Sequence, residues 1–136
     1  MSNNYSCIIS FHTNPYTCGV ARFNRALADE MAIALLSIEE FVIEPIANAL
    51  VSVKFDEMSP EATVLLGSVL LEGAISFSLL LHDVHKSPEE VAFCQRAGKV
   101  FAANAELRVK LLDVRPDSVA TFAPGAAEQK QAGTFD

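Results

Sequence analysis

Short apolar runs alternate with helix-start signals along this sequence, and this alternation limits the possible folds more than any other feature. The segments between the runs carry apolar residues at helical spacing or begin with Ser-Pro-Glu. Strands that alternate with helices indicate βαβ units, because parallel strands need helical crossovers. We therefore expect an α/β fold: a single Rossmann-like, doubly wound parallel sheet with helices on both faces. The expected strands are residues 5–11, 34–38, 49–55, 75–81, 99–103 and 118–123.

Two of the expected helices begin with Ser-Pro-Glu, which makes Ser the N-cap and Pro the first helical residue. In the second of these, Glu90 stands three residues after Ser87 and predicts a complete capping box. Gly98 is expected to end that helix as its C-cap. Residues 39–48 receive no assignment, because a proline interrupts them. The expected helices are residues 19–33, 60–71, 88–97 and 105–113.

The chain has 136 residues, of which 51% are hydrophobic, enough for the core of one domain. We expect this domain to span residues 1–125 and residues 126–136 to form a polar linker or tail. The longest apolar stretch, residues 64–81, has Glu72-Gly73 at its centre. A charge and a turn signal there predict a helix followed by a strand, and not a transmembrane segment.

The formal net charge is −7, and residues 28–61 alone, with eight acidic residues and one lysine, account for it. A basic surface is missing, so we expect no nucleic-acid partner. Three cysteines without Cys-x-x-Cys spacing indicate neither a disulfide framework nor a zinc site and favour a cytoplasmic location. The N-terminus lacks the basic start of a signal peptide.

The loop of residues 12–19 joins the first expected strand to a helix. Ligands of doubly wound sheets bind at the carboxyl ends of strands, and free N–H groups at a helix N-terminus favour an anion. Gly19 allows a ligand to approach the backbone closely. Arg22 lies in the first helical turn, where a cation is better tolerated if an anion is bound. Cys18 is either a nucleophile or, more simply, a small packing residue.

The loop after residues 75–81 contains His82, Asp83 and His85. Two imidazoles and a carboxylate at the end of a strand fit a general acid–base site, a sugar-binding pair or half of a metal site. A polar turn without chemistry fits the same residues. A metal needs further ligands, and only the distant His12 offers one, so we expect neither a metal nor a cofactor.

Four segments, taken in chain order, resemble the N-terminal half of a GT-B glycosyltransferase of the family 4 type. The first is a Gly-containing loop that leads into a helix with an aromatic residue and the ending x-Leu-Ala. The last resembles the I-P-N-G sequence close to the domain linker of that family. The usual Gly-Gly is Cys18-Gly19 here, and Asn104 replaces a common Ser. The segments are residues 14–28 (NPYTCGVARFNRALA), 80–83 (LLHD), 100–104 (VFAAN) and 119–125 (VATFAPG).

The resemblance covers about residues 5–125 and implies the acceptor-side half of a retaining glycosyltransferase, which transfers a sugar from a nucleotide-sugar donor. It implies that His82 faces the cleft between two domains and contacts the transferred sugar as the catalytic residue. The family's C-terminal donor-binding domain is the implied partner, without which we expect no activity. The implied donor-phosphate or substrate-binding residues are Asn14, Gly19, Arg22, Asp83 and His85.

Two other functions stay open. The first is a stand-alone α/β binding or regulatory module that resembles a receiver domain. A receiver domain needs an acidic pair after the first strand and an Asp after the third. Asp56-Glu57 follows the third expected strand, but Phe11-His12 ends the first. A catalytically inactive half that pairs with a separate chain has the same sequence features as an active half.

Overall fold

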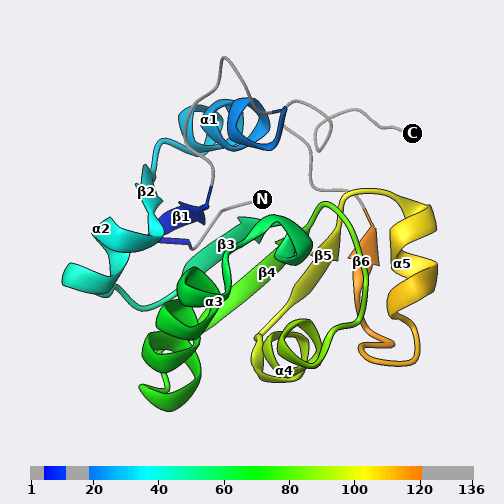
Figure 1. The fold of residues 1–136 in the computed structure, drawn as a ribbon. Coiled ribbons are helices and arrows are strands. Elements are labelled where there is room, and N and C mark those ends of the chain that lie inside the picture. The colour runs from blue at the N-terminus through cyan, green and yellow to red at the C-terminus, as the bar shows by residue number, and fades with distance from the viewer. Residues whose placement is uncertain (1–4, 12–18, 121–136) are drawn as a thin grey trace.

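The computed structural model describes residues 5–11 and 19–120, which form a six-stranded sheet with the order β2-β1-β3-β4-β5-β6 (Figure 1). All neighbouring strands in it are parallel. The chain winds from β1 outward in both directions, which confirms the expected doubly wound α/β fold. The strands are β1 (Cys7–Ser10), β2 (Ala34–Ser37), β3 (Ala49–Val53), β4 (Phe77–Leu81), β5 (Val100–Ala102) and β6 (Val119–Ala120).

Helices lie on both faces of this sheet, as expected (Figure 1). On one face, α1 packs its residues Leu27 and Ala28 against Ile8, Leu50 and Leu80 of the central strands. The alternate residues of the same strands form the larger core with the other helices. The helices are α1 (Gly19–Met31), α2 (Ile38–Ile43), α3 (Pro60–Gly67), α4 (Pro88–Arg96) and α5 (Ala105–Leu111), with the short helices η1 (Phe55–Glu57) and η2 (Ser68–Glu72).

The three central strands β1, β3 and β4 are buried along their whole length. Burial on both faces explains why their sequences read as continuous apolar runs without alternation. The long apolar stretch divides as expected, since α3 continues into the π-helical η2 and β4 starts four residues after Gly73 ends it. A Cβ on Gly73 would lie 2.4 Å from the Val69 carbonyl oxygen, so only glycine fits there. None of the helices in the described part of the chain has the length and apolar character needed to cross a membrane.

The unassigned segment contains a helix that sequence reasoning missed. Ser37 caps α2, and Glu40 closes a complete capping box with it. The helix is only six residues long and ends at Ile43, just before the proline. The proline therefore sets the end of α2 and does not exclude a helix.

The helix α4 begins at Pro88 with Ser87 as its N-cap, as predicted, but its capping contacts differ from the prediction. Ser87 caps it, but the Glu90 side chain accepts from the backbone N–H of His85 and leaves the reciprocal half of the capping box unmade. The C-cap is Ala97, and not Gly98. The Arg115 guanidinium donates to the carbonyls of Cys94 and Ala97, so the end of α4 is satisfied without a glycine cap.

Candidate functional site

His82 lies at the carboxyl edge of the sheet, directly after β4, where its backbone N–H donates to the Val53 carbonyl of β3. Its ring meets the Phe23 ring of α1 edge-on, with 5.0 Å between the centroids. The first turns of α1 and the end of β4 therefore share one edge, as the sequence predicted. The side chain is partly buried beneath α1 and still reaches the surface.

A buried polar network holds His82 in place. The His82 Nε2 atom lies 2.8 Å from the Ser52 hydroxyl oxygen, and this hydroxyl donates to the Asn24 side-chain oxygen. The Asn24 amide nitrogen donates to Ser10 Oγ at 2.8 Å and to the Ser52 carbonyl at 3.0 Å. Ser10, Asn24 and Ser52 are fully buried, so the network ties together β1, α1, β3 and the end of β4.

The direction of these hydrogen bonds determines the tautomer of His82. A backbone carbonyl only accepts, so the Asn24 nitrogen must face the Ser52 carbonyl and the Asn24 oxygen must face the Ser52 hydroxyl. The Ser52 hydroxyl has one proton, which it donates to the Asn24 oxygen. The His82 Nε2 must therefore carry a proton and donate it to Ser52, which leaves Nδ1 as the acceptor of a neutral ring.

Burial, together with the positive charge of Lys54, lowers the pKa of His82 to about 4. The ring is therefore neutral at physiological pH. A base this weak is poorly suited to removing a proton, but Nδ1 can accept a hydrogen bond from a hydroxyl group. Among the described residues, none donates a hydrogen bond to Nδ1.

Arg22 is exposed in the first turn of α1. Its Nη2 atom lies 3.7 Å from where a Cβ on Gly19 would be, so the guanidinium reaches back over the helix N-terminus. No acidic side chain occupies this first turn. A helix N-terminus and a nearby guanidinium both favour an anion at this end of α1. Asn14, Cys18 and His12 lie outside the described residues.

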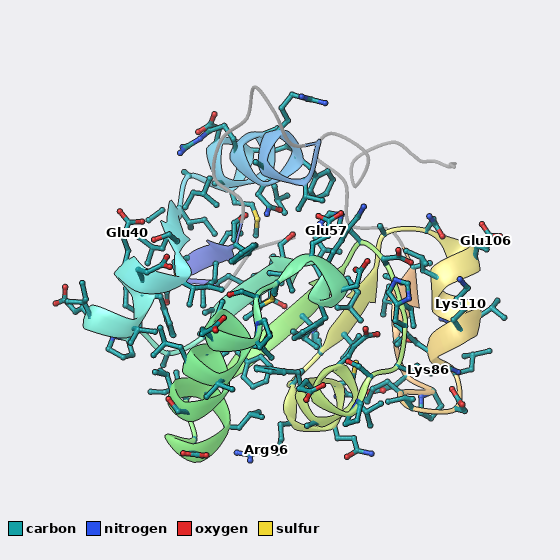
Figure 2. All side chains as sticks on the ribbon, in the orientation of Figure 1. Glu40, Glu57, Lys86, Arg96, Glu106 and Lys110 are labelled. Atoms are coloured by element: carbon teal, nitrogen blue, oxygen red, sulfur yellow. The ribbon has the colours of Figure 1, made fainter. Side chains whose placement is uncertain are left out.

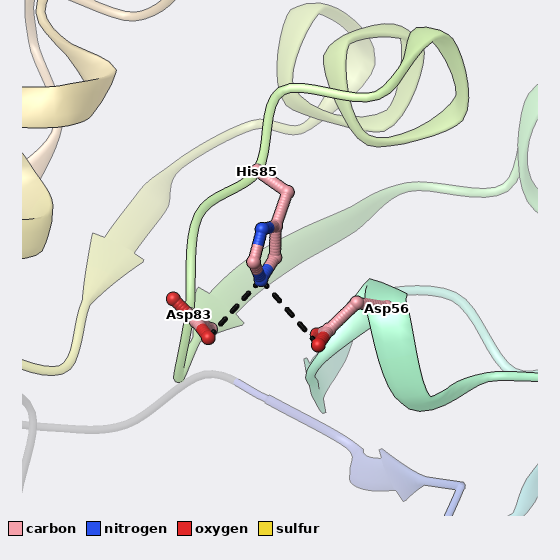
Figure 3. Close-up of side chains that lie close together, drawn as sticks. All are labelled: Asp56, Asp83 and His85. Carbon is pink, nitrogen blue, oxygen red and sulfur yellow. Dashed lines mark hydrogen bonds and ion pairs between the residues drawn. The ribbon is translucent and has the colours of Figure 1, made fainter.

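Asp83 and His85 contact each other, and His85 also contacts a residue of a different element. The His85 Nε2 atom lies 3.1 Å from Asp83 Oδ2 and 3.4 Å from Oδ2 of Asp56 in η1 (Figure 3). The Val84 backbone N–H donates to Asp83 and, with smaller contributions from His85, lowers the pKa of that carboxyl. The three residues that the sequence predicted in this loop thus do not form one site. His82 belongs to the buried network with Ser52, and Asp83 and His85 form a separate cluster with Asp56.

The loop that carries His85 is held at two further points. Lys86 reaches toward the end of α5, where its Nζ lies 3.2 Å from Asp113 (Figure 2). Glu90 of α4 accepts the His85 backbone N–H at 3.2 Å. A cavity of about 280 Å³ lies beside this loop, between η1, α3 and α4. Asp56, His85, Glu89 and Glu90 are its titratable lining residues, and Phe55 and Met58 are among its apolar residues.

The remaining candidates have structural roles. Asn104 is the N-cap of α5, and its side chain accepts from the Leu107 backbone N–H at 2.9 Å. Burial raises the pKa of the Cys7 thiol to about 11 and that of Cys94 to about 12. Neither is a nucleophile at neutral pH, because the thiolate is the reactive form.

Sequence reasoning missed Asn24, Ser52 and Asp56 as site residues. Asn24 and Ser52 leave a weak signal, since each is a small polar residue at a position that the helix or strand pattern assigns to the core. Sequence reasoning identified Asp56 as an acidic residue after the third strand. It could not predict the contact with His85, because that contact depends on β3 and β4 being neighbours in the sheet.

No protein-family model, curated protein or solved structure matches this chain. The fold and the side-chain geometry at the carboxyl edge are therefore the basis for a functional assignment.

Proposed function

We propose that this chain is the acceptor-side half of a retaining glycosyltransferase, which acts on a nucleotide-sugar donor and a sugar acceptor in the cytoplasm. It resembles the N-terminal half of family 4-type GT-B enzymes in the order of its motifs, and the all-parallel sheet fits that fold. The observation that carries the proposal is His82: a neutral imidazole at the carboxyl edge, with Nε2 bonded to Ser52 and with Nδ1 receiving no hydrogen bond from the part of the chain that the structure describes.

In this role, His82 orients the transferred sugar. Nδ1 accepts a hydrogen bond from a sugar hydroxyl, and the network through Ser52 and Asn24 keeps the ring from rotating. The ring is neutral and acts neither as nucleophile nor as proton acceptor. It holds the reacting carbon in line with the acceptor, which lowers the entropic part of the barrier.

The start of α1 completes the proposed donor contacts. Arg22 and the backbone N–H groups near Gly19 offer charge-assisted hydrogen bonds to the diphosphate. Most of the nucleotide would be bound by a donor-binding domain of the kind that is C-terminal in the family 4-type enzymes. This domain would lie on the same chain or on a separate one. The proposal therefore requires that domain for sugar transfer.

The proposal is tested by the release of nucleoside diphosphate from UDP-, GDP- and ADP-sugars. We expect no steady release by the 136-residue chain alone and steady release after a donor-binding domain is joined to it after residue 125. Steady turnover by the isolated chain would contradict the proposal, as would a joined, folded enzyme that is inactive with every donor and acceptor sugar.

A stand-alone regulatory module is the second candidate, because the order β2-β1-β3-β4-β5 is also that of flavodoxin-like and receiver domains. Asp56, after β3, would be its phosphorylated residue. Incubation with acetyl phosphate separates the two functions: stable modification of Asp56 would favour the receiver, and an unmodified chain would favour the transferase.

A further inference from the structure

The cluster of Asp56, Asp83 and His85 has the spacing of a metal-ligand set. One potential ligand atom from each residue lies within 4.8 Å of the other two. Tetrahedral ligands with bonds of about 2.1 Å are separated by roughly 3.4 Å. The distances from His85 Nε2 to the two carboxylate oxygens, 3.1 and 3.4 Å, are close to that value.

An ion pair alone explains this convergence less well than a cation does. The Nε2 atom of His85 has at most one proton, which can be donated in good geometry to one oxygen only. Carboxylate oxygens from two different elements nevertheless approach this single nitrogen (Figure 3). A metal ion between the three atoms uses the nitrogen lone pair and both oxygens together.

Glu90 gives an independent indication of a cation. Its side chain is 1% exposed and lines the same cavity as Asp56 and His85. One carboxylate oxygen accepts from the His85 backbone N–H, but Oε2 has no hydrogen-bond partner among the described residues. A buried carboxylate oxygen without a partner is costly, and a nearby cation offsets that cost.

We propose that Asp56, Asp83 and His85 bind a divalent transition-metal cation at the mouth of this cavity, with the charge of Glu90 supporting it from inside. Two oxygens and one imidazole nitrogen suit Zn²⁺ or Mn²⁺ better than Mg²⁺. Three protein ligands leave a coordination position open to water or to an oxygen of a ligand in the cavity. The site goes beyond the proposed glycosyl transfer and departs from the sequence-based expectation of no metal.

Calorimetric titration of the full chain with Zn²⁺ tests the site. We expect one saturable site whose affinity falls at least about tenfold in Asp83→Asn and in His85→Ala. Asp29→Asn is the matched control, because it removes one carboxylate from the exposed surface of α1. It should bind Zn²⁺ as the wild type does. Glu90→Gln keeps an acceptor for the His85 N–H but loses the charge, so its affinity should fall by a smaller factor.

The position of the ion is tested with substoichiometric Mn²⁺, whose unpaired electrons broaden nearby NMR signals. The backbone amides of Asp56, Asp83 and His85 should broaden first. The proposal is overturned by a lack of saturable Zn²⁺ binding, by wild-type affinity in Asp83→Asn and His85→Ala, or by broadening centred elsewhere. Wild-type affinity in Glu90→Gln would overturn the contribution of Glu90.

Discussion

The Nε2 atom of His82 lies 2.8 Å from the Ser52 hydroxyl oxygen, and the hydroxyl proton points to Asn24. This relationship makes Nε2 the donor and Nδ1 the acceptor of a neutral imidazole. It also ties a residue at the edge of the sheet to a buried network between α1 and the central strands. The predictions for His82 follow from that geometry.

The first prediction concerns protonation. His82 has a pKa of about 4 in the folded chain, against 6.5 for an ordinary histidine. Between pH 6.5 and about pH 4, His82 binds more protons in the unfolded chain than in the folded chain. The free energy of unfolding therefore falls as the pH is lowered through this range. From pH 7 to pH 5 this one group should cost about 2 kcal/mol. Urea unfolding at both values measures the loss, and NMR of the imidazole nitrogens should show the Nε2–H tautomer.

The control for this prediction is His82→Gln, whose side-chain N–H can replace Nε2–H as the donor to Ser52. The variant has no titrating group at position 82. The free energy of unfolding of the wild type minus that of His82→Gln should therefore decrease from pH 7 to pH 5. An equal difference at both values would show that His82 does not have a lowered pKa.

The second prediction concerns the buried network. Asn24→Ala removes the buried hydrogen bonds of Asn24 to the Ser52 carbonyl, the Ser52 hydroxyl and the Ser10 hydroxyl, and the loss of hydrogen bonds between buried groups is costly. We expect a loss of about 2–3 kcal/mol in the free energy of unfolding. Asn104→Ala, the matched change, removes only a helix cap and should cost about 1 kcal/mol. Equal losses in urea unfolding would argue against a special role for the network.

The third prediction concerns Arg22 and the start of α1. Arg22→Ala should weaken the binding of a nucleotide sugar to the two-domain enzyme by about tenfold to a hundredfold, because a hydrogen bond to a charged group contributes about 1.5–3 kcal/mol. Stability should change by no more than about 1 kcal/mol, because contacts of an exposed charged side chain contribute little. Arg25→Ala serves as control, since Arg25 lies on the same helix and pairs with Asp29. Similar affinities of the two variants would remove Arg22 from the donor site.

Most of the fold follows from local patterns that the sequence carries. The Ser-Pro-Glu starts predicted α3 and α4, and the apolar runs predicted the buried strands β1, β3 and β4. Helix α2 was missed because the proline just beyond its end was taken to exclude a long helix, and the Ser37–Glu40 capping box was not recognised in the sequence. The capping box and the glycine C-cap of α4 were wrongly predicted because Glu90 and Arg115 make contacts that depend on tertiary structure.

The candidate site was only partly predictable for a related reason. Position along the chain placed His82 at the carboxyl edge, since the residue after a parallel strand must lie there. The direction of each side chain depends on its neighbours across the sheet. His82 points toward Phe23 and Ser52, whereas His85, three residues later, points toward Asp56. A pattern of residue types carries no information on that difference.

The central claim is that Nδ1 of His82 orients the transferred sugar, and the turnover number of the two-domain enzyme with His82→Ala tests it most directly. This variant has no side-chain acceptor in place of Nδ1, so turnover should fall about a hundredfold or more while the fold is retained. His85→Ala, a change in the same loop, should have a much smaller effect. Wild-type turnover in folded His82→Ala, or an equal loss in His85→Ala, would contradict the claim.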